Sequence, residues 1–237
     1  MKLDTLAPLA QTAHDTAETT ESFVRNLHDG VELALAEQRA EREAELKSVD
    51  PNDRDTARKL DASVWADRRR AMRDEAEKQH GDRLAKMRER LLDQRAQLTE
   101  ISELVGDTPS HLLTYLGSTG SDRSAALWPQ VQHAGHATLR QLARKAIAER
   151  DIELASLIAT RMSGLRPKDR PVAVEDLAEK LVGERHARQR AAVDLALDRV
   201  QDGLESVARW TTGRNPRGSG RTRIERGLRD HARAAQR

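Results

Sequence analysis

Cysteine is absent from this chain of 237 residues, and aromatic residues are scarce. The lack of cysteine excludes a disulfide framework, a cysteine-ligated zinc site and thiolate catalysis. Only five aromatic residues are available for a core, namely Phe23, Trp65, Tyr115, Trp128 and Trp210. Charged residues make up 34% of the chain, compared with about 25% in typical globular proteins. A compact globule of this length normally buries much of its chain, so the composition favours an elongated, helical or oligomer-dependent protein.

Long apolar runs are also absent. No stretch approaches the roughly 20 apolar residues that a membrane-spanning helix needs. The first residues include Asp4 and form no continuous apolar segment. The sequence therefore predicts a soluble chain that is not exported by the general route, needs no oxidising compartment and has no membrane partner.

The formal net charge of +2 hides a strong asymmetry along the chain. Residues 212–237 contain eight arginines and two acidic residues, a net charge of +6, so residues 1–211 sum to −4. Because arginine pairs well with phosphate and carboxylate groups, this segment is predicted to bind nucleic acid or an acidic protein surface. Its end has the pattern of a short amphipathic helix around Ile224 and Leu228. The arginines are Arg214, Arg217, Arg221, Arg223, Arg226, Arg229, Arg233 and Arg237.

The first part of the chain, residues 1–49, is predicted to form N-terminal helices. Small and apolar residues recur at alternating steps of three and four, which is the spacing of a helix-packing seam. They are Ala10, Ala13, Ala17, Thr20, Val24, Leu27 and Val31. The small side chains let a partner helix approach closely, from this chain or from another. Beyond Gly30 the helix continues to Lys47, and its end carries charges of alternating sign that are typical of a solvated face.

Residues 50–211 are predicted to form the main helical bundle, whose first helix begins at Pro51. Asp50 can cap the free amides of the first turn, and proline at the first helical position loses no hydrogen bond. The second half of this helix carries another seam: Leu84, Met87, Leu91, Gln94, Leu98, Ile101 and Val105. Apolar residues of the first half follow a different phase: Ala57, Leu60, Val64 and Ala71. We therefore expect a kink, stutter or break within residues 74–83, where Gly81 also weakens the helix.

Shorter helices are predicted in the middle of the chain. Glycine and proline within residues 106–109 end the long helix, and a short helix follows. Residues 117–121 are glycine-rich and predict a flexible turn, after which the next helix is expected to open at Trp128–Pro129. A break at residues 150–151 separates that helix from another over residues 152–162. The two would form a compact helical hairpin.

A last long helix is predicted from residue 171 to about residue 210. Its seam residues are Val174, Leu177, Leu181, Val193, Leu197, Val200, Leu204 and Val207. A charged middle at residues 183–190 contains a glycine, as does the middle of the helix over residues 51–105. This symmetry favours antiparallel pairing of the two helices.

Together these patterns predict an all-α fold. It is an elongated helical bundle with two long helices, a short helical hairpin and a basic C-terminal extension over residues 212–237. No segment alternates β-branched and polar residues over a strand length, so no strand is predicted. The residues chosen to represent the helix-packing seams are Val24, Leu27, Leu84, Leu91, Leu98, Ile101, Val193, Leu197, Val200 and Leu204.

No motif in the chain predicts a reaction. A helix would bring His133 and His136 to one face, but zinc would need a third ligand such as His111 or Glu149. The glycine-rich residues 117–121 lack the lysine of a phosphate-binding loop and have no preceding strand, which favours an interhelical turn. We expect no catalytic residue, no metal site and no cofactor.

A second charged segment, residues 66–90, contains nine basic and six acidic residues, including three consecutive arginines at 68–70. Because acids and bases interleave, a solvated helix with ion pairs between successive turns is favoured over a nucleic-acid surface.

The seams and the basic extension favour a non-enzymatic subunit of a homo-oligomeric assembly. The seams would pack between subunits, and the extension would dock on a neighbour or on DNA. In architecture and charge distribution the chain resembles the helical head-to-tail adaptor (connector) proteins of tailed bacteriophages. In that family a helical bundle forms a ring, usually twelvefold, beneath the portal, and a C-terminal extension grips the portal.

The resemblance implies that residues 1–211 are the bundle and residues 212–237 the extension. It also implies portal and tail components as partners, and a place in the virion after assembly in the host cytoplasm. An internal or scaffold-like helical virion protein would suit the same features. The alternative hypothesis is a cytoplasmic nucleic-acid-binding protein of a cell, in which the arginine-rich segment binds phosphates.

Overall fold

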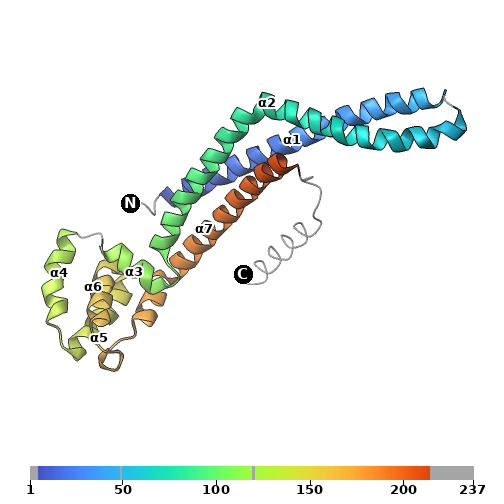
Figure 1. Ribbon diagram of the computed structural model, residues 1–237. Helices are drawn as coiled ribbons and strands as arrows, with labels where there is room; N and C mark the ends of the chain where they lie inside the picture. Colours follow the sequence, from blue (N-terminus) through green and yellow to red (C-terminus); the bar gives the residue numbers. More distant parts are fainter. Residues whose placement is uncertain (1–4, 49, 119–120, 214–237) are drawn as a thin grey trace. The chain divides into compact units, whose positions relative to one another are not determined.

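The computed structural model describes residues 5–48, 50–118 and 121–213, and it is all-α over these residues (Figure 1). The long helices are α1 (Leu6–Leu46), α2 (Pro51–Val105) and α7 (Val174–Thr212). Between α2 and α7 lie α3 (Pro109–Ser118), α4 (Asp122–Gln132), α5 (His136–Glu149), α6 (Ile152–Ser163) and the short 3-10 helix η2 (Pro167–Asp169). The described residues contain no β-strand, so the predicted all-α class is confirmed.

Most helix ends fall where the sequence signals predicted them. At the start of α2, the amide of Asp53 donates to the carbonyl of Asp50 over 3.0 Å. α2 ends before Gly106, whose φ of 66° is a left-handed conformation that glycine adopts without strain. Asp151 caps α6, because its Oδ1 accepts the amide hydrogen of Leu154 over 3.0 Å.

Two predictions about the long helices are wrong. The sequence predicted two long helices, but α1 is a third and runs for 41 residues through Gly30. Glycine inside a helix costs only about 1 kcal/mol, which packing on both sides of it outweighs. Of the kink, stutter or break expected within residues 74–83, the break is wrong, because α2 is continuous through Gly81 over its 55 residues. The change of seam phase therefore occurs inside one continuous helix.

The prediction that Trp128–Pro129 opens a helix is wrong as well. The helix there is α4, which starts at Asp122, because the Ser121 hydroxyl accepts the amide hydrogen of Ser124 over 3.0 Å. Pro129 lies inside α4, and α4 ends at Gln132 before α5 starts a separate helix. The strong capping residue Ser121, about two turns earlier, decides the start, while the proline is tolerated near the end of a short helix.

The chain divides into two compact units, which we describe separately. The first contains residues 1–12 and 94–198, and the second contains residues 13–93 and 199–237. These divisions differ from the predicted segments 1–49, 50–211 and 212–237. The units are set by which helices pair across long separations in sequence, and α1, α2 and α7 each contribute to both.

The core of the first unit is built around α6, which packs against α3, α4 and α5. Its buried residues are Leu154, Ala155, Ser156, Ile158, Ala159 and Met162. α3 approaches α6 closely at Gly117, where a Cβ atom would collide with Cβ and Oγ of Ser156. α4 is joined to the start of α6 by the guanidinium of Arg123, which contacts both carboxylate oxygens of Asp151.

In the same unit, α7 runs antiparallel to the last turns of α2, as the sequence predicted. Nε2 of the buried His186 lies 3.1 Å from the carbonyl oxygen of Gly106. One turn later Arg190 donates to Ser102 Oγ over 3.4 Å and pairs with Asp107 at 3.2 Å. The polar middle of α7 is therefore partly packed on α2.

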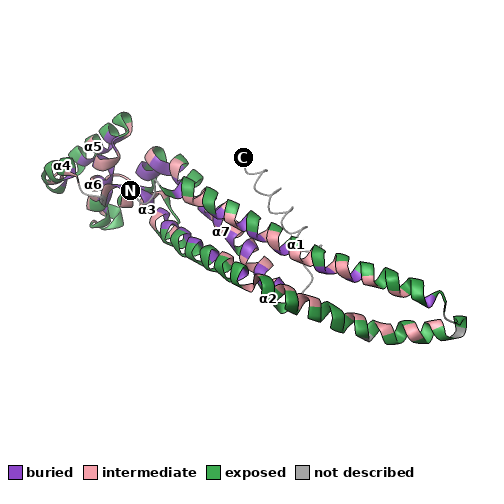
Figure 2. Ribbon diagram, turned by 90° about the horizontal axis from the view of Figure 1, so that it is seen from above, coloured by how far each residue is buried: buried purple, intermediate pink, exposed green. Residues whose placement is uncertain are grey.

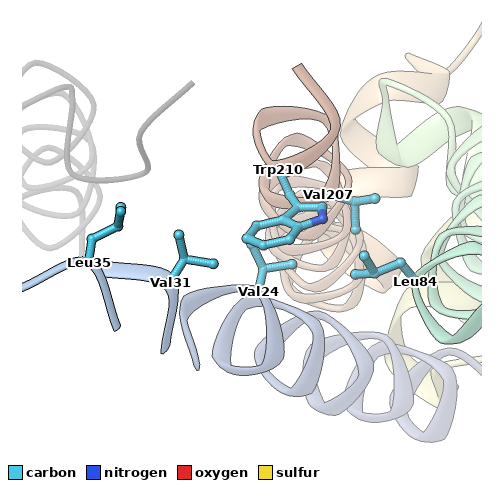
Figure 3. Packing of buried hydrophobic residues seen from close by; sticks show 6 residues of the cluster. All are labelled: Val24, Val31, Leu35, Leu84, Val207 and Trp210. Atoms are coloured by element: carbon cyan, nitrogen blue, oxygen red, sulfur yellow. The ribbon is translucent and has the colours of Figure 1, made fainter. Parts of the chain in front are cut away.

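In the second unit, α1, α2 and α7 form a three-helix core. A cluster of buried residues joins them, namely Val24, Val31, Leu35, Leu84, Val207 and Trp210 (Figure 3). Gly203 allows α7 to approach α1, since a Cβ there would lie 3.0 Å from Leu91 Cδ1 and 3.3 Å from Ala17 Cα. The partner helix that the small residues of α1 admit thus comes from the same chain.

The buried face of α7 includes five of the eight predicted seam residues, namely Val174, Leu177, Val193, Val200 and Val207, but not the three other leucines. Leu181, Leu197 and Leu204 are only partly buried. The buried positions from the middle of α7 onward include Val182, His186, Val193, Ala196, Val200, Gly203, Val207 and Trp210. They follow the same three-and-four spacing with small residues at 196 and 203. Leu197 and Leu204, each one position after a small buried residue, have the stronger apolar signal and hid the small residues of this face.

Candidate interaction surface

The arginine-rich segment that the sequence selects lies outside the described residues. Of residues 212–237, the structure describes only Thr212 and Gly213. It therefore places none of the eight arginines, but it does define the surface on which that segment begins.

The predicted seam residues are placed inside a single chain. Seven are buried, namely Val24, Leu84, Leu91, Leu98, Ile101, Val193 and Val200, and three are partly buried, namely Leu27, Leu197 and Leu204. The expectation that these seams pack between subunits needs correction, because helices of the same chain already cover them. Contacts with another subunit would have to use other surfaces.

The histidine pair is not brought together on one helix. His133 is the C-cap of α4, and His136 is the first residue of α5. The backbone between them leaves the helical path, so the spacing of three no longer aligns the imidazoles on one face. In the part of the chain that the structure describes, no group of three histidine, aspartate or glutamate side chains is placed to hold a metal ion.

The three-helix core extends on one side into a two-helix hairpin. α1 and α2 continue side by side past the end of α7, as Figures 1 and 2 show. We call residues 32–46 of α1 and 51–72 of α2 the distal hairpin. Arg69 joins its helices through Glu32 at 2.9 Å, and Arg42 does so through Asp61 at 3.1 Å.

The distal hairpin also holds the half-buried Trp65 between two guanidinium groups. The Arg39 and Arg68 Cζ atoms lie 5.6 Å and 4.9 Å from the centre of a Trp65 ring. Such cation–π contacts and cross-helix ion pairs replace the apolar core that α7 supplies elsewhere. Arg68 and Arg69 of the basic run 68–70 thus make contacts within the chain. This agrees with the favoured interpretation of residues 66–90 as a solvated, ion-paired helix.

Large apolar side chains are exposed on this hairpin. Leu33 on α1 is 62% exposed, and on α2 Leu60 is 67% and Val64 is 43% exposed. Leu60 and Val64 are four residues apart and therefore neighbours on one helix face. They belong to the seam of different phase that starts at Ala57 and ends at Ala71, and Ala71 is exposed too. This seam has no covering helix among the described residues.

α1 concentrates the negative charge of the chain. It carries nine acidic residues and three arginines, a net charge of −6. A groove of about 280 Å³ runs between α1 and α7 and is lined by Glu18, Glu21 and Arg25 of α1 and by Arg199 of α7, among others. The acidic character of α1 was readable from the sequence, but its placement beside α7 was not.

The end of α7 is held by residues of α1 and α2. Arg73 of α2 donates from Nη2 to the Trp210 carbonyl, and its Cζ lies 5.5 Å from the centre of the indole ring. A cation at this position interacts favourably with the negative, C-terminal end of the α7 dipole. Gly213 follows with φ 75°, and a Cβ there would collide with Arg73 Nη1. The left-handed φ therefore favours glycine at this position, whereas the end of the flexible Arg73 side chain could shift to make room for a Cβ.

His28 of α1 packs edge-on against the same indole, with ring centres 4.8 Å apart. Burial lowers the pKa of His28 below its ordinary value, and the charge of Arg73 lowers it further, while Glu32 and Asp29 act in the opposite direction. Nε2 of His28 and Nε1 of Trp210 are buried without a hydrogen-bond partner in the described structure. No sequence pattern indicates this cluster, because its members come from three helices.

The fold and these surfaces define an all-α protein with an acidic first helix, a projecting helical hairpin and a basic segment at its end. No protein-family model, curated protein or solved structure matches the chain. Across the described ranges, no helix combines the length and the apolar character needed to cross a bilayer.

Proposed function

We propose that this protein is a non-enzymatic subunit of a homo-oligomeric assembly and that the distal hairpin supplies a contact between subunits. The observation that carries the proposal is the exposed seam on α2, in which Leu60 and Val64 are 67% and 43% exposed. Apolar residues at this spacing are typical of a helix that packs against another helix. An uncovered seam of this kind marks an interaction site.

The two seams of α2 support the proposal, because one makes contacts within the chain and the other is exposed. The seam that begins at Leu84 faces helices of the same chain and is buried, whereas the seam that begins at Ala57 faces outward. One helix thus presents an internal face in one half and an external face in the other. This arrangement suits a subunit that folds alone and assembles through its hairpin.

The specific form of the proposal is a bacteriophage virion component of the head-to-tail adaptor type. In that form the hairpin would contact the neighbouring subunit, and residues 212–237 would bind the portal. The supporting features are the helical architecture and the segregation of charge into a basic segment of +6 and a remainder of −4.

Native mass measurement of the full chain over a range of concentrations tests the proposal. We expect oligomers that dissociate on dilution. The double variant Leu60→Glu, Val64→Glu should shift the distribution to monomer, because two charges would be desolvated in the contact. A strict monomer at all concentrations would refute self-assembly.

A matched control is available on the same helix. Leu92 is 41% exposed but lies next to the internal seam, outside the distal hairpin. Leu92→Glu should leave the oligomer mass unchanged. If both variants disrupted the oligomer equally, the contact would not be specific to the hairpin. Circular dichroism of each variant checks that its helices are retained.

A second candidate function is nucleic-acid binding through the C-terminal segment. The observation that favours it is the excess of eight arginines over two acidic residues in residues 212–237. Its signature would be an affinity that falls steeply with salt concentration.

A further inference from the structure

The small helices of the first unit carry an excess of basic residues. Residues 121–172 contain nine basic and five acidic residues. Three of the five acids gather around Arg123 of α4. Its guanidinium contacts Asp151 and lies 3.6 Å from Glu153. The hydrogen bond from Asp151 raises the pKa of Arg123, and the charge of Glu149 adds to this effect. The local carboxylates are thus concentrated at α4 rather than at the cations of α5.

α5 has an apolar inner side and a basic outer side. The inner side packs on α6, and its buried residues are Leu139, Ala143 and Ala146. Helical periodicity turns the opposite side toward solvent. The exposed residues of this outer side are Ala137, Gln141, Arg144, Lys145 and Ala148. The outer side therefore has two cations in its middle, short side chains at both ends and no acidic residue.

The cations of α5 are not neutralised inside the chain. Within the part of the chain that the structure describes, Arg144, Lys145 and Arg150 form no ion pair. The arginines of the distal hairpin, by contrast, pair with carboxylates of the facing helix. Cations that gather on one side of a helix without acidic partners attract a polyanion.

Arg150 occupies a backbone position that favours glycine. It is the C-cap of α5, and among the described residues only Arg150 combines a side chain with a positive φ, which is 52°. Glycine adopts this left-handed conformation without strain, whereas arginine does so at a cost in stability. The side chain adds an exposed cation at the end of α5.

The loop between α6 and α7 adds cations beside α5. Arg140 Nε on α5 donates to the carbonyl of Pro171 over 3.2 Å, which places this loop along α5, one turn from Arg144. The loop contains three basic residues and one acidic residue, namely Arg166, Lys168, Arg170 and Asp169. Of the three basic residues, Arg166 and Lys168 are exposed. A polyanion seated on α5 would meet these cations at its edge.

We infer that the outer side of α5 binds duplex DNA, with α5 in the major groove and the loop after α6 against the phosphates. The major groove is about 12 Å wide, which admits a helix of about 10–12 Å with its side chains. Arg144 and Lys145 suit phosphates or guanine, and Gln141 suits adenine. Double-stranded RNA is excluded as the ligand, because its major groove is too narrow for side chains to read.

The order of elements also suits this ligand. α4 and α5 both pack on α6, and a turn of three residues that includes Gly135 joins them. In helix-turn-helix proteins the second helix, reached by such a turn, enters the groove. The inference goes beyond the proposed function, because the assembly contact lies on the distal hairpin. It also differs from the second candidate function, which rests on residues 212–237.

Binding of the full-length protein to a short DNA duplex over a series of salt concentrations tests the inference. Arg144→Gln with Lys145→Gln should weaken binding about ten-fold. It should also make the slope of log affinity against log salt shallower by about 2, because two cationic contacts are lost. Residues 212–237 are present in every variant, so their contribution is common to all of them.

A matched control is available on α2. Lys86 and Arg90 are exposed and form no ion pair within the described residues. Lys86→Gln with Arg90→Gln removes the same charges and should leave the affinity and the slope unchanged. Equal losses in the two double variants would mean that only net charge matters, which would overturn the inference.

Arg150→Gly separates binding from folding. Glycine relieves the left-handed conformation, so the melting temperature should rise. The loss of one cation should nevertheless weaken DNA binding and make the salt slope shallower by about 1. A variant that is more stable and binds less tightly cannot owe its loss of affinity to unfolding. Unchanged affinity in both this variant and the α5 double variant would contradict the inference.

A fluorophore on the outer side of α5 locates the DNA directly. Because the chain has no cysteine, Gln141→Cys carries a single label. Duplex DNA should shield this label from an aqueous quencher, while a label at Gln97→Cys, on an exposed position of α2, should stay accessible. Equal shielding at both positions, or at neither, would overturn the inference.

Two competitors test the class of ligand. Polyglutamate that displaces the duplex as effectively as unlabelled DNA would assign the outer side of α5 to an acidic protein surface instead. Double-stranded RNA that binds as tightly as DNA would contradict insertion into the major groove. The oligomer mass of the Leu60→Glu, Val64→Glu variant is a separate readout, so this inference and the proposed function can fail independently.

Discussion

Gly117 and Gly81 both lie in helices, but their surroundings give them different roles. A Cβ at Gly117 would collide with Ser156 of α6, whereas a Cβ at Gly81 would have no heavy atom within 4 Å. The first glycine allows two helices to pack closely, and the second only weakens its own helix. The sequence predicted a turn at Gly117 and a weakened helix at Gly81, whereas the structure places both residues inside helices.

Gly117→Ala should therefore destabilise the protein, and Gly81→Ala should stabilise it. Overpacking at the α3–α6 crossing costs about 1–3 kcal/mol. Alanine in place of glycine in a helix interior gains about 0.5–1 kcal/mol. Urea unfolding curves of the two variants check this, with the wild type between them. Two variants that shift the midpoint in the same direction would contradict the assigned roles.

His28 should make stability depend on pH. Its pKa is lowered in the folded state, first by burial and then by Arg73. The stability that neutral His28 contributes is fully present above its unfolded pKa of about 6.5 and is lost as pH falls through the lower folded pKa. Acidification should therefore reduce the unfolding free energy of the wild type more than that of His28→Gln.

Urea unfolding of both proteins at about pH 7.5 and about pH 5, on either side of the ordinary histidine pKa, measures this difference. His133→Gln is the control, because His133 is exposed at the end of α4 and should follow the wild type. An acid-induced loss of stability that persists in His28→Gln would assign the effect to other groups.

At the scale of elements, α2 contains two neighbouring leucines with opposite surroundings. Leu91 is fully buried beside Gly203 of α7, and Leu92 is 41% exposed. Leu91→Ala should lower the unfolding free energy by about 2–5 kcal/mol, because it removes buried methyl groups and leaves a cavity beside Gly203. Leu92→Ala should change it by less than about 0.5 kcal/mol. Thermal or urea unfolding measures both changes in stability. Equal effects would contradict the assignment of Leu91, rather than Leu92, to the buried seam.

Helix starts and stops were largely predictable from the sequence because they depend on local chemistry. Asp50, Gly106 and Asp151 act through atoms within a few residues of themselves. The seam of α2 was predictable for a similar reason, since large apolar residues recur at one spacing. One failure was the expected interruption around Gly81, which α2 passes through without a break.

The buried face of α7 shows why packing was harder to predict than helix content. Ala196 and Gly203 belong to that face because another helix approaches there, and small residues give little apolar signal of their own. The candidate interaction surface was hard to predict for the same reason. The acidic residues of α1 can be counted from the sequence, but Arg73, His28 and Trp210 meet only because three helices converge.

For the whole molecule, the distribution of charge is better described by elements than by the total. α1 alone carries −6, more than the −4 of residues 1–211, so the other elements of that part sum to +2. The chain thus has an acidic helix near one end and a basic segment at the other. In the assembly proposal the basic segment binds a protein, whereas in the alternative it binds phosphates, and this difference separates the two candidate functions.

DNA binding by the full chain and by a chain that ends at Gly213 tests this separation. If the segment binds a protein partner, both chains should bind duplex DNA weakly, with affinities that differ by no more than a few-fold at physiological salt. The Leu60→Glu, Val64→Glu variant should change the oligomer mass without changing that affinity. Truncation that abolishes a strong affinity, together with a log–log salt slope near −7 for eight neutralised phosphates, would instead establish the nucleic-acid-binding function.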